Sequence, residues 1–389
     1  MIDRAYLDHN ATAPLRPEAR AALLAALDDT GNASSVHAEG RRARGRIAAA
    51  RAEVAALAGM PAAGVVFTSG ATEALALALS PTLLPPGSAV APQVLLASAA
   101  EHPAVLRGHR FPPGALDILP VDGAGRLDLA ALGEALARHR AQGRRALLAM
   151  MAANNETGVV QDIAGAVAIA REFDAVVVCD AVQAAGRVDL AALVAGVDAV
   201  CLSAHKIGGP QGAGALVLAH SDTRLGPLLC GGGQELGRRA GTENGPAIAG
   251  FGAAASVARA TFAAEALRLA DLRDRMEQDV RASLPGAVVL GDAAPRLSNT
   301  SLIAFPGVRA ETLVIALDLA HISVSAGAAC ASGKVGASHV LAAMGVAPDL
   351  AAGAIRLSLG WTSTAEHVTR AVTALQRLVP QLAERSSAA

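Results

Sequence analysis

The chain has 389 residues, of which 52% are hydrophobic and 2% aromatic, and its 33 basic and 34 acidic residues leave a formal net charge of -1. This near balance excludes the strongly basic surface of a dedicated nucleic-acid or membrane-surface binder, so we expect a small-molecule ligand, no nucleic acid and no membrane partner. The length predicts one large domain and one smaller domain, each with its own apolar core.

The N-terminal residues, MIDRAYLDHN, contain two aspartates and no apolar stretch behind a basic cluster. They match neither a secretory signal nor a transit peptide, and we therefore expect a cytoplasmic protein. Residues 74–100 carry no charge, but four prolines among them would break a membrane helix. We interpret that stretch as buried core with a loop.

From about residue 60 to residue 220, short apolar runs alternate with polar residues and helical stretches, which is typical of an α/β fold. Five runs are predicted to be buried strands of a mostly parallel sheet flanked by helices: VVF (65–67), VLLAS (94–98), ALLAMM (146–151), AVVVCD (175–180) and DAVCLS (198–203). This large domain is predicted to span 15–260. An amphipathic helix from Thr261 to Leu284 would leave it, opening a smaller α+β domain over 261–389, on which residues 1–14 pack.

Polar residues follow these strands, at the edge where open α/β sheets bind their ligands. The site predicted there draws on five segments: Thr68, Ser69, Glu101, His102, Asn154, Asn155, Asp180, Gln183, Ser203, His205 and Lys206. A glycine turn and a helix that begins with Ala71 and Thr72 would gather backbone N–H groups around a phosphate. A plain helix cap made by Ser69 or Thr72 explains the same residues.

The chain contains 31 arginines but only two lysines, Lys206 and Lys334. A guanidinium stays protonated and cannot form a Schiff base, whereas an amine can, so both lysines are candidates unless they are surface residues left by chance. Lys206 lies in SAHKIGGPQGAGAL. Its glycines do not form a nucleotide-binding loop, because the GxxxxGK[ST] motif is absent and a strand-like run follows them instead of a helix. Asp180 ends a buried strand, where a protonated pyridine nitrogen would neutralise it; a helix N-cap is the alternative.

The four cysteines form no CxxC pair, so we predict reduced thiols, no disulfide framework and no metal site. Cys179, Cys201 and Cys230 lie in apolar runs and are predicted core residues. Cys330 lies in SAGAACASGKVGAS, which is too rich in small residues to form a regular element and is predicted to display its thiol. We interpret Lys334 as a surface charge of this segment, although it could also lower the pKa of the thiol.

Eight motifs run through the chain in one order: FTSGATE, EHPAVL, NNETG, DAVQAAG, SAHKIGGPQGAGAL, GGGQELGRRAGTEN, SAGAACASG and IRLSLG. With them, residues 6–360 resemble the NifS/IscS family of cysteine desulfurases. The resemblance implies a homodimer of the fold-type I, class V aminotransferase kind, with pyridoxal 5′-phosphate as cofactor.

The resemblance also implies a role for each site residue. Lys206 would bind the cofactor covalently, Asp180 would pair with its pyridine nitrogen, and His102 would stack on its ring and relay protons. Gln183 and Asn155 would bind the ring oxygen region, while Ala71, Thr72, Ser203 and His205, with Thr242 supplied by the partner subunit, would hold the phosphate. Arg356, with Asn155, would bind the substrate carboxylate as a bidentate fork. Taken singly, His102 and Arg356 would be structural residues.

The implied reaction begins when the amine of L-cysteine displaces Lys206, which then removes the α-proton. The Cys330 thiolate attacks the substrate sulfur, and an enzyme persulfide and alanine result. Sulfur would pass from Cys330 to an iron–sulfur scaffold or another acceptor protein. Cys330 would contact a metal only transiently, during this transfer. One alternative is a different reaction on the same fold, either selenocysteine lyase or another aminotransferase-type reaction. The other alternative is a protein that is not an enzyme and takes part in sulfur transfer without catalysis. Because SAGAAC replaces an expected SSGSAC and the tail QLAERSSAA is short, the acceptor stays open.

Overall fold

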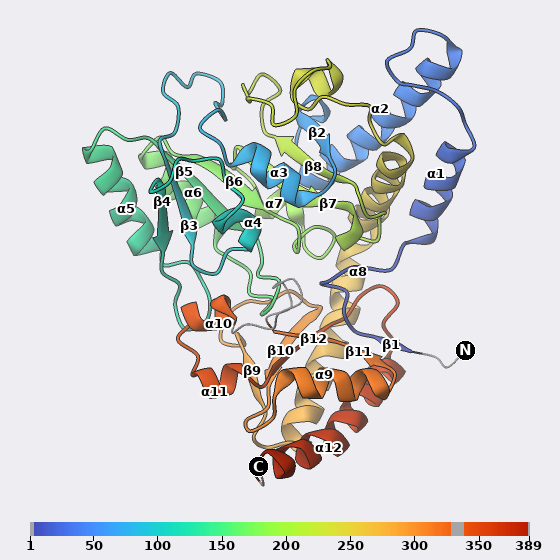
Figure 1. Cartoon of the computed structure of the whole chain (residues 1–389), viewed down its shortest axis with the longest axis vertical. Helices are drawn as coiled ribbons and strands as arrows, with labels where there is room; N and C mark the ends of the chain where they lie inside the picture. The colour runs from blue at the N-terminus through green and yellow to red at the C-terminus, as the bar shows by residue number, and fades with distance from the viewer. Residues whose placement is uncertain (1–3, 328–337, 388–389) are drawn as a thin grey trace.

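A computed structural model describes residues 4–327 and 338–387, with side chains to residue 384. Cys330 and Lys334 lie outside the described residues. A larger sheet with its helices and a smaller sheet with its own helices lie one above the other, and both chain termini lie beside the smaller sheet (Figure 1).

The larger sheet has seven strands in the order β2-β8-β7-β6-β5-β3-β4. Their bounds are β2 (Val65–Thr68), β3 (Val94–Ser98), β4 (Leu116–Leu119), β5 (Ala146–Met151), β6 (Val176–Asp180), β7 (Ala199–Ser203) and β8 (Gly214–Leu218). β8 runs antiparallel to both neighbours, and the other pairs are parallel. The five predicted strands and the mostly parallel sheet are therefore confirmed.

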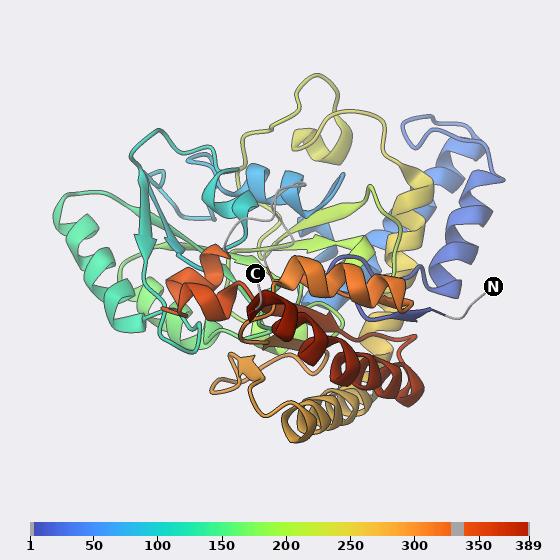
Figure 2. The same ribbon diagram turned by 60° about the horizontal axis from the view of Figure 1, so that its bottom comes forward.

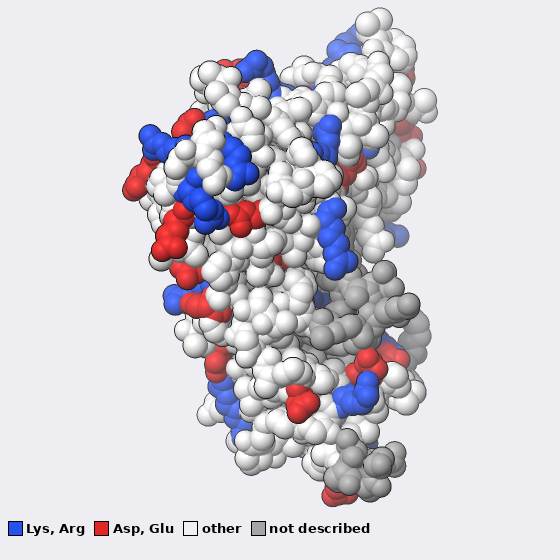
Figure 3. All heavy atoms as spheres, turned by 60° about the vertical axis from the view of Figure 1, so that its left-hand side comes forward, with Lys and Arg blue, Asp and Glu red and all other residues white. Residues whose placement is uncertain are grey.

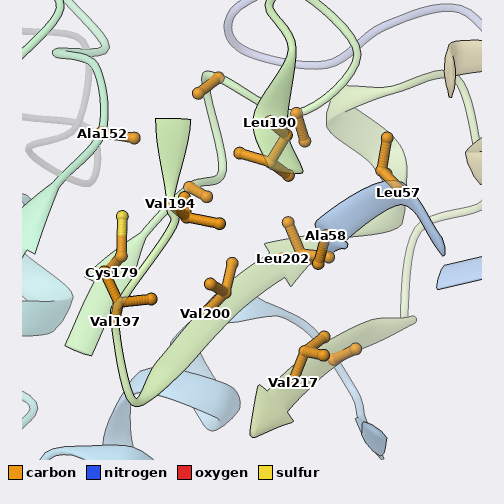
Figure 4. Packing of buried hydrophobic residues seen from close by; sticks show 14 of the residues in the cluster. Leu57, Ala58, Ala152, Cys179, Leu190, Val194, Val197, Val200, Leu202 and Val217 are labelled. Atoms are coloured by element: carbon orange, nitrogen blue, oxygen red, sulfur yellow. The ribbon is translucent and has the colours of Figure 1, made fainter. Parts of the chain in front are cut away.

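Successive residues of these strands enter two different apolar clusters, as the two-residue period of a strand requires. Five helices cover one face: α2 (Ala38–Ala58), α5 (Leu129–Ala141), α6 (Ile163–Glu172), α7 (Leu190–Leu193) and the first half of α8 (Gly245–Ser283). On this face Leu202 of β7 lies beside Ala58 of α2, and Val200, Leu57 and Leu190 belong to the same cluster (Figure 4). The other face is covered by α3 (Ala71–Ala78) and α4 (Pro103–Leu106), while α1 (Pro17–Leu27) packs on α8.

The smaller sheet has the order β12-β13-β10-β9 and is antiparallel throughout. Its strands are β9 (Val288–Leu290), β10 (Thr300–Ala304), β12 (Ser325–Ala326) and β13 (Ala354–Ser358). Beside it, β1 (Ala5–Tyr6) pairs in parallel with β11 (Ile322–Ser323). α9 (Ala310–Leu319), α12 (Ala365–Ser387) and the second half of α8 share one core with this sheet, and α10 (His339–Ala343) and α11 (Pro348–Ala351) pack by a second cluster. Figure 2 shows α9 and α12 side by side. The separate α+β unit is confirmed.

The long helix α8 begins at Gly245, well before the predicted start at Thr261. The side chain of Asn244 accepts a hydrogen bond from the Ala247 N–H and caps the helix, and Pro246 stands in the first turn, where proline is tolerated. α8 therefore runs through the predicted boundary at 260/261, and that boundary stays a prediction. Among the described helices, only α8 is long and apolar enough to cross a membrane, a property that it shares with buried core helices.

The surface and one cysteine complete the comparison with the sequence. Basic and acidic side chains are interspersed on the face shown in Figure 3.

Cys230, predicted as a core residue, is exposed, so that prediction is wrong. Its apolar run, 228–230, lies outside the sheet, in the connection between β8 and the 3₁₀ turn η3 (Gln234–Gly237), where a single chain offers nothing to cover it.

Gly252 in α8 is predicted to be essential for the close approach of α2. A Cβ atom added there would lie 2.5 Å from the Cα of Ala50, whereas one added to Gly45 of α2 meets nothing within 4 Å. Gly45→Ala should raise the free energy of unfolding by about 0.5–1 kcal/mol through helix propensity alone. Gly252→Ala should lower it by about 1–2 kcal/mol, because overpacking outweighs the same gain. Urea denaturation measures both, and equal stabilisation by the two changes would contradict the packing argument.

Candidate active site

A cavity of about 520 Å³ lies at the carboxyl ends of the parallel strands. Of the predicted site residues, it brings together Ser69, Ala71, Thr72, His102, Asn155, Asp180, Gln183, Ser203, His205, Lys206 and Arg356. Arg356 comes from β13 of the smaller sheet, and all the others come from the large unit. The cavity therefore lies between the two units, and the roles of these residues stay predictions.

Lys206 ends the 3₁₀ turn η2 (Ala204–Lys206), which follows β7 directly. Its Nζ donates hydrogen bonds to the main-chain oxygens of Asn10, at 2.6 Å, and Ala11, at 2.8 Å. Sequence reasoning missed both residues, although the polar LDHNAT stretch in which they lie was a usable signal. The N-terminal segment thus reaches from the smaller sheet to the candidate lysine.

Asp180 ends β6 and is 8% exposed. Its Oδ1 accepts a hydrogen bond from the Val182 N–H at 3.1 Å. Burial raises the pKa of this carboxyl to about 6, although that hydrogen bond and the charge of Lys206 act in the opposite direction. The residues that follow form turns and no helix, so Asp180 is not a helix N-cap. A cation or donor placed against it would stabilise its ionised form.

Two histidines border the cavity as neutral groups. Burial, followed by the charges of Lys206 and His339, lowers the pKa of His102 to about 4. Burial and then Lys206 lower the pKa of His205 to about 4 as well. His102 Nδ1 accepts from the Ala104 N–H at 3.1 Å, and His205 Nδ1 lies 3.2 Å from Thr12 Oγ1. Neither ring is charged near neutral pH. Because Nδ1 of His102 accepts a hydrogen bond, Nε2 of that ring carries the proton and is a donor.

The N-terminus of α3 lies at the cavity without a side-chain cap. Its N-cap is Gly70, so neither Ser69 nor Thr72 caps the helix, and the capping alternative is wrong. β8 passes so close that a Cβ on Gly214 would lie 2.5 Å from the carbonyl carbon of Gly70. Backbone and small residues thus form this wall, as at helix N-termini that bind anions.

Gln183 and Arg356 are held by the N-terminal segment as well. Gln183 Nε2 donates to the Asn10 carbonyl at 3.1 Å, and its Oε1 accepts from Arg187. Arg356 donates from Nη1 to the Asn155 carbonyl and from Nη2 to Asp8 Oδ1, each at 2.9 Å. Asp8 is a further residue that sequence reasoning missed.

Four predicted site residues that the structure describes do not line the cavity: Thr68, Glu101, Asn154 and Thr242. Thr242 lines a separate hollow of about 230 Å³ beside α1 and α2, so its assignment to the phosphate through a partner subunit stays a prediction. Cys330 lies outside the described residues. Burial raises the pKa of the Cys179 and Cys201 thiols well above the usual value, which makes both poor nucleophiles. No group of three potential metal-binding side chains occurs within 4–327 and 338–387.

Comparison with known proteins places the whole chain in one family. The family model for aminotransferase class-V matches residues 5–371, and the chain belongs to that family. A cysteine desulfurase of Cereibacter sphaeroides is 43% identical over 387 residues, covering 98% of this chain and 97% of the relative. The cysteine desulfurase IscS of Dictyoglomus turgidum is 36% identical, with 97% and 95% covered. The structure of a NifS-like protein from Rickettsia africae matches with a TM-score of 0.87 at 31% identity, covering 97% and 100%. Within its class, the chain is therefore one of the NifS/IscS-like cysteine desulfurases, and the resemblance is confirmed.

The lowered pKa values of His102 and His205 predict a loss of stability in acid. The unfolded chain, with an ordinary histidine pKa of 6.5, binds protons that the folded protein rejects until about pH 4. This contribution to stability is complete above about pH 6.5 and is lost as the pH falls toward 4. In urea unfolding of the cofactor-free protein, this contribution is the difference between wild type and His205→Gln, in which stability should fall less as the pH is lowered; the raised pKa values of Asp180 and Glu156 act in the opposite direction in both proteins. The exposed His220, changed to Gln, is the control; identical slopes for wild type and His205→Gln would refute the assignment.

Proposed function

We propose that this cysteine desulfurase holds pyridoxal 5′-phosphate on Lys206, converts L-cysteine to L-alanine and transfers the sulfur to Cys330. The observation that carries the proposal is the placement of the Lys206 amine and the buried Asp180 carboxylate in one cavity with the uncapped N-terminus of α3. The family match and the full-length relatives support the same chemistry.

The chain's donor set fits this cofactor at three separate points. The Lys206 amine suits its aldehyde, Asp180 suits a protonated pyridine nitrogen, and the α3 N-terminus with Thr72, Ser203 and His205 suits a phosphate. Asp180 has a concrete need for such a partner, because burial raises its pKa to about 6. When bound, the cofactor supplies an electron sink for the carbanion formed at the substrate α-carbon.

Each of the nearby side chains then has a defined task. Once the substrate amine takes its place, Lys206 Nζ becomes a free base that can remove the α-proton. The main-chain oxygens of Asn10 and Ala11, 2.6 and 2.8 Å away, keep this amine at the cavity. His102, which is half-buried and neutral near pH 7, lines the same cavity and would relay protons there. Arg356 offers its guanidinium to the α-carboxylate.

In the sulfur step, the thiolate of Cys330 attacks the substrate sulfur. The new S–S bond forms as the substrate Cβ–S bond breaks, the electron pair stays with the substrate carbon, and protonation of that carbon yields alanine. Cys330 keeps the transferred sulfur as a persulfide. Among the described cysteines, Cys179 and Cys201 are excluded from this task by burial.

The substrate assignment has support from one further structure and from the relatives. SspA in complex with cysteine matches this fold with a TM-score of 0.74 at 26% identity, covering 93% of this chain and all of that chain. Several full-length relatives are cysteine desulfurases, so selenocysteine lyase and other aminotransferase-type reactions are not favoured. The intact set of Lys206, Asp180 and His102 also disfavours a non-catalytic sulfur-transfer protein.

We further propose that the working unit is a cytoplasmic homodimer that passes sulfur to an iron–sulfur scaffold or another acceptor protein. Leu236 is 80% exposed and Val36 is 82% exposed. Exposure of such apolar side chains to water is unfavourable, and a second copy of the chain would cover them. Thr242 lies outside the cavity of its own chain, so it can complete a phosphate site only in a partner.

Lys206→Arg should abolish covalent cofactor binding, because a guanidinium cannot form the Schiff base. Borohydride reduction of cofactor-supplemented wild type, followed by peptide mass spectrometry, should fix a pyridoxyl group to Lys206. The chain has one other lysine, so Lys334→Arg is a matched control that should retain the label at Lys206. A label that survives Lys206→Arg, or one absent from wild type, would refute the proposed cofactor site.

Cys330→Ser should lower alanine and sulfide release from L-cysteine by at least about 10³-fold, the scale expected for loss of a nucleophile. The exposed Cys230, changed to Ser, should leave the rate unchanged. Mass spectrometry after L-cysteine should find one added sulfur on the Cys330 peptide of wild type. Normal turnover by Cys330→Ser would disprove the persulfide route.

A further inference from the structure

The wall that the start of α3 contributes to the cavity is held by a carboxylate outside the cavity. Four consecutive residues line this wall: Ser69, Gly70, Ala71 and Thr72. The next residue, Glu73, is not among the described residues that line the cavity. Its Oε2 accepts a hydrogen bond of 2.6 Å from the Ser69 N–H, which joins the first turn of the helix to the residue before its N-cap. Glu73 thus fixes the turn that the proposed function assigns to the phosphate.

Glu73 is paired with a cation from a distant loop. Arg239 donates from Nε to Glu73 Oε1 at 2.9 Å and from Nη2 to Oε2 at 3.4 Å. The side chains of Arg239 and Glu73 are 20% and 12% exposed, so solvent screens their charges only in part. Burial acts to raise the pKa of Glu73, but the hydrogen bonds from Arg239 and Ser69 lower it below its ordinary value. The carboxylate is therefore ionised near neutral pH, with Arg239 as its counter-charge.

The loop that carries Arg239 is anchored to the preceding strand at a second point. Glu235 of η3 has a side chain that is 1% exposed, and its Oε2 accepts from the Phe67 N–H of β2 at 3.0 Å. Its two carboxylate oxygens also accept from Arg51 of α2, at 2.7 and 2.8 Å. Glu235 and Leu236 have φ angles of 49° and 59°, which residues other than glycine keep only where contacts hold them. These contacts fix the loop and give Arg239 a defined position.

A carboxylate at this place would by itself oppose phosphate binding. The N-terminus of α3 favours an anion, because the first N–H groups and the positive end of the helix dipole lie there. An unpaired Glu73 would repel a phosphate group bound at the same turn. Arg239 removes this conflict, since it neutralises Glu73 while the hydrogen bond from Ser69 is kept.

We propose that Glu73 and Arg239 are positioning residues for the cofactor phosphate: Glu73 fixes the turn at Ser69, and Arg239 cancels the charge that would otherwise repel the phosphate. The inference rests on the proposed function, in which this turn holds the phosphate of pyridoxal 5′-phosphate. Neither side chain is among the described residues that line the cavity, so both act through the turn and through their charges. The role therefore concerns the phosphate and leaves the reaction of Lys206 with the aldehyde unchanged.

The test compares pyridoxal 5′-phosphate with pyridoxal, which carries the aldehyde but no phosphate. Each is titrated into the cofactor-free, full-length protein, and the absorption of the Schiff base gives the dissociation constant. Arg239→Gln should weaken the binding of pyridoxal 5′-phosphate by about tenfold, the scale of one uncompensated charge near a protein surface, and leave the binding of pyridoxal unchanged. Arg259→Gln, which breaks an exposed ion pair with Glu53, is the matched control and should bind both compounds as wild type does.

Second substitutions at Glu73 separate its charge from its hydrogen bond. Glu73→Gln keeps an oxygen acceptor for the Ser69 N–H but has no charge, so Glu73→Gln/Arg239→Gln should regain the wild-type affinity for pyridoxal 5′-phosphate to within about twofold. Glu73→Ala/Arg239→Gln lacks the acceptor as well and should bind this cofactor about fivefold more weakly than the first double variant, the effect of one lost hydrogen bond. A purely structural effect of Arg239, such as displacement of Thr242, would not be reversed by Glu73→Gln.

The pattern of affinities decides the outcome, and pyridoxal binding also reports that each variant folds. A phosphate-specific loss in Arg239→Gln that Glu73→Gln reverses supports the proposal. Equal losses for the two compounds, wild-type affinity of Arg239→Gln, or a Glu73→Gln/Arg239→Gln variant as weak as Arg239→Gln would overturn it. Equal affinities of the two double variants would overturn the role of the Glu73 hydrogen bond. If wild type itself forms no Schiff base at Lys206, the proposed function fails, and that result is distinct from tight binding that these variants leave unaltered.

Discussion

The site depends on how charged groups are neutralised where water is largely excluded. Arg356 is 2% exposed and Asp180 is 8% exposed, and an isolated charge at that depth is costly. Arg356 is matched by Asp8, and the Lys206 ammonium is matched by two main-chain carbonyls. Asp180 has a single backbone donor and a raised pKa, so it is the group that is left for a bound cation to satisfy.

The N-terminal segment supplies most of this compensation. Its strand β1 pairs with β11 beside the smaller sheet, and residues 8–11 then pass from there to the end of the larger sheet. Carbonyls and one carboxylate from this segment hold Lys206, Gln183 and Arg356, which come from both units. A short stretch of chain therefore fixes the relation between the candidate cofactor lysine and the candidate carboxylate-binding arginine.

Neutral histidines fit the same constraint. A second and third positive charge beside Lys206 would be unfavourable, and burial together with Lys206 keeps His102 and His205 uncharged. Burial also favours the neutral form of the Glu156 carboxyl, since it raises the pKa of that group to about 7. Both histidines therefore stay neutral at neutral pH, and Asp180, whose pKa burial raises to about 6, is the cavity-lining group among these whose charge changes closest to neutral pH.

The sequence by itself determined the strands of the large sheet and the groups at their ends. Buried parallel strands read as unbroken apolar runs, and the residue that follows each run must lie at the common carboxyl edge, so Asp180, His102 and Lys206 could be predicted to meet. Only the tertiary structure decided the contribution of Asp8 and Asn10, the start of α8 at Gly245 and the exposure of Cys230. These features depend on which distant segments pack against each other, and local periodicity carries no information on such contacts.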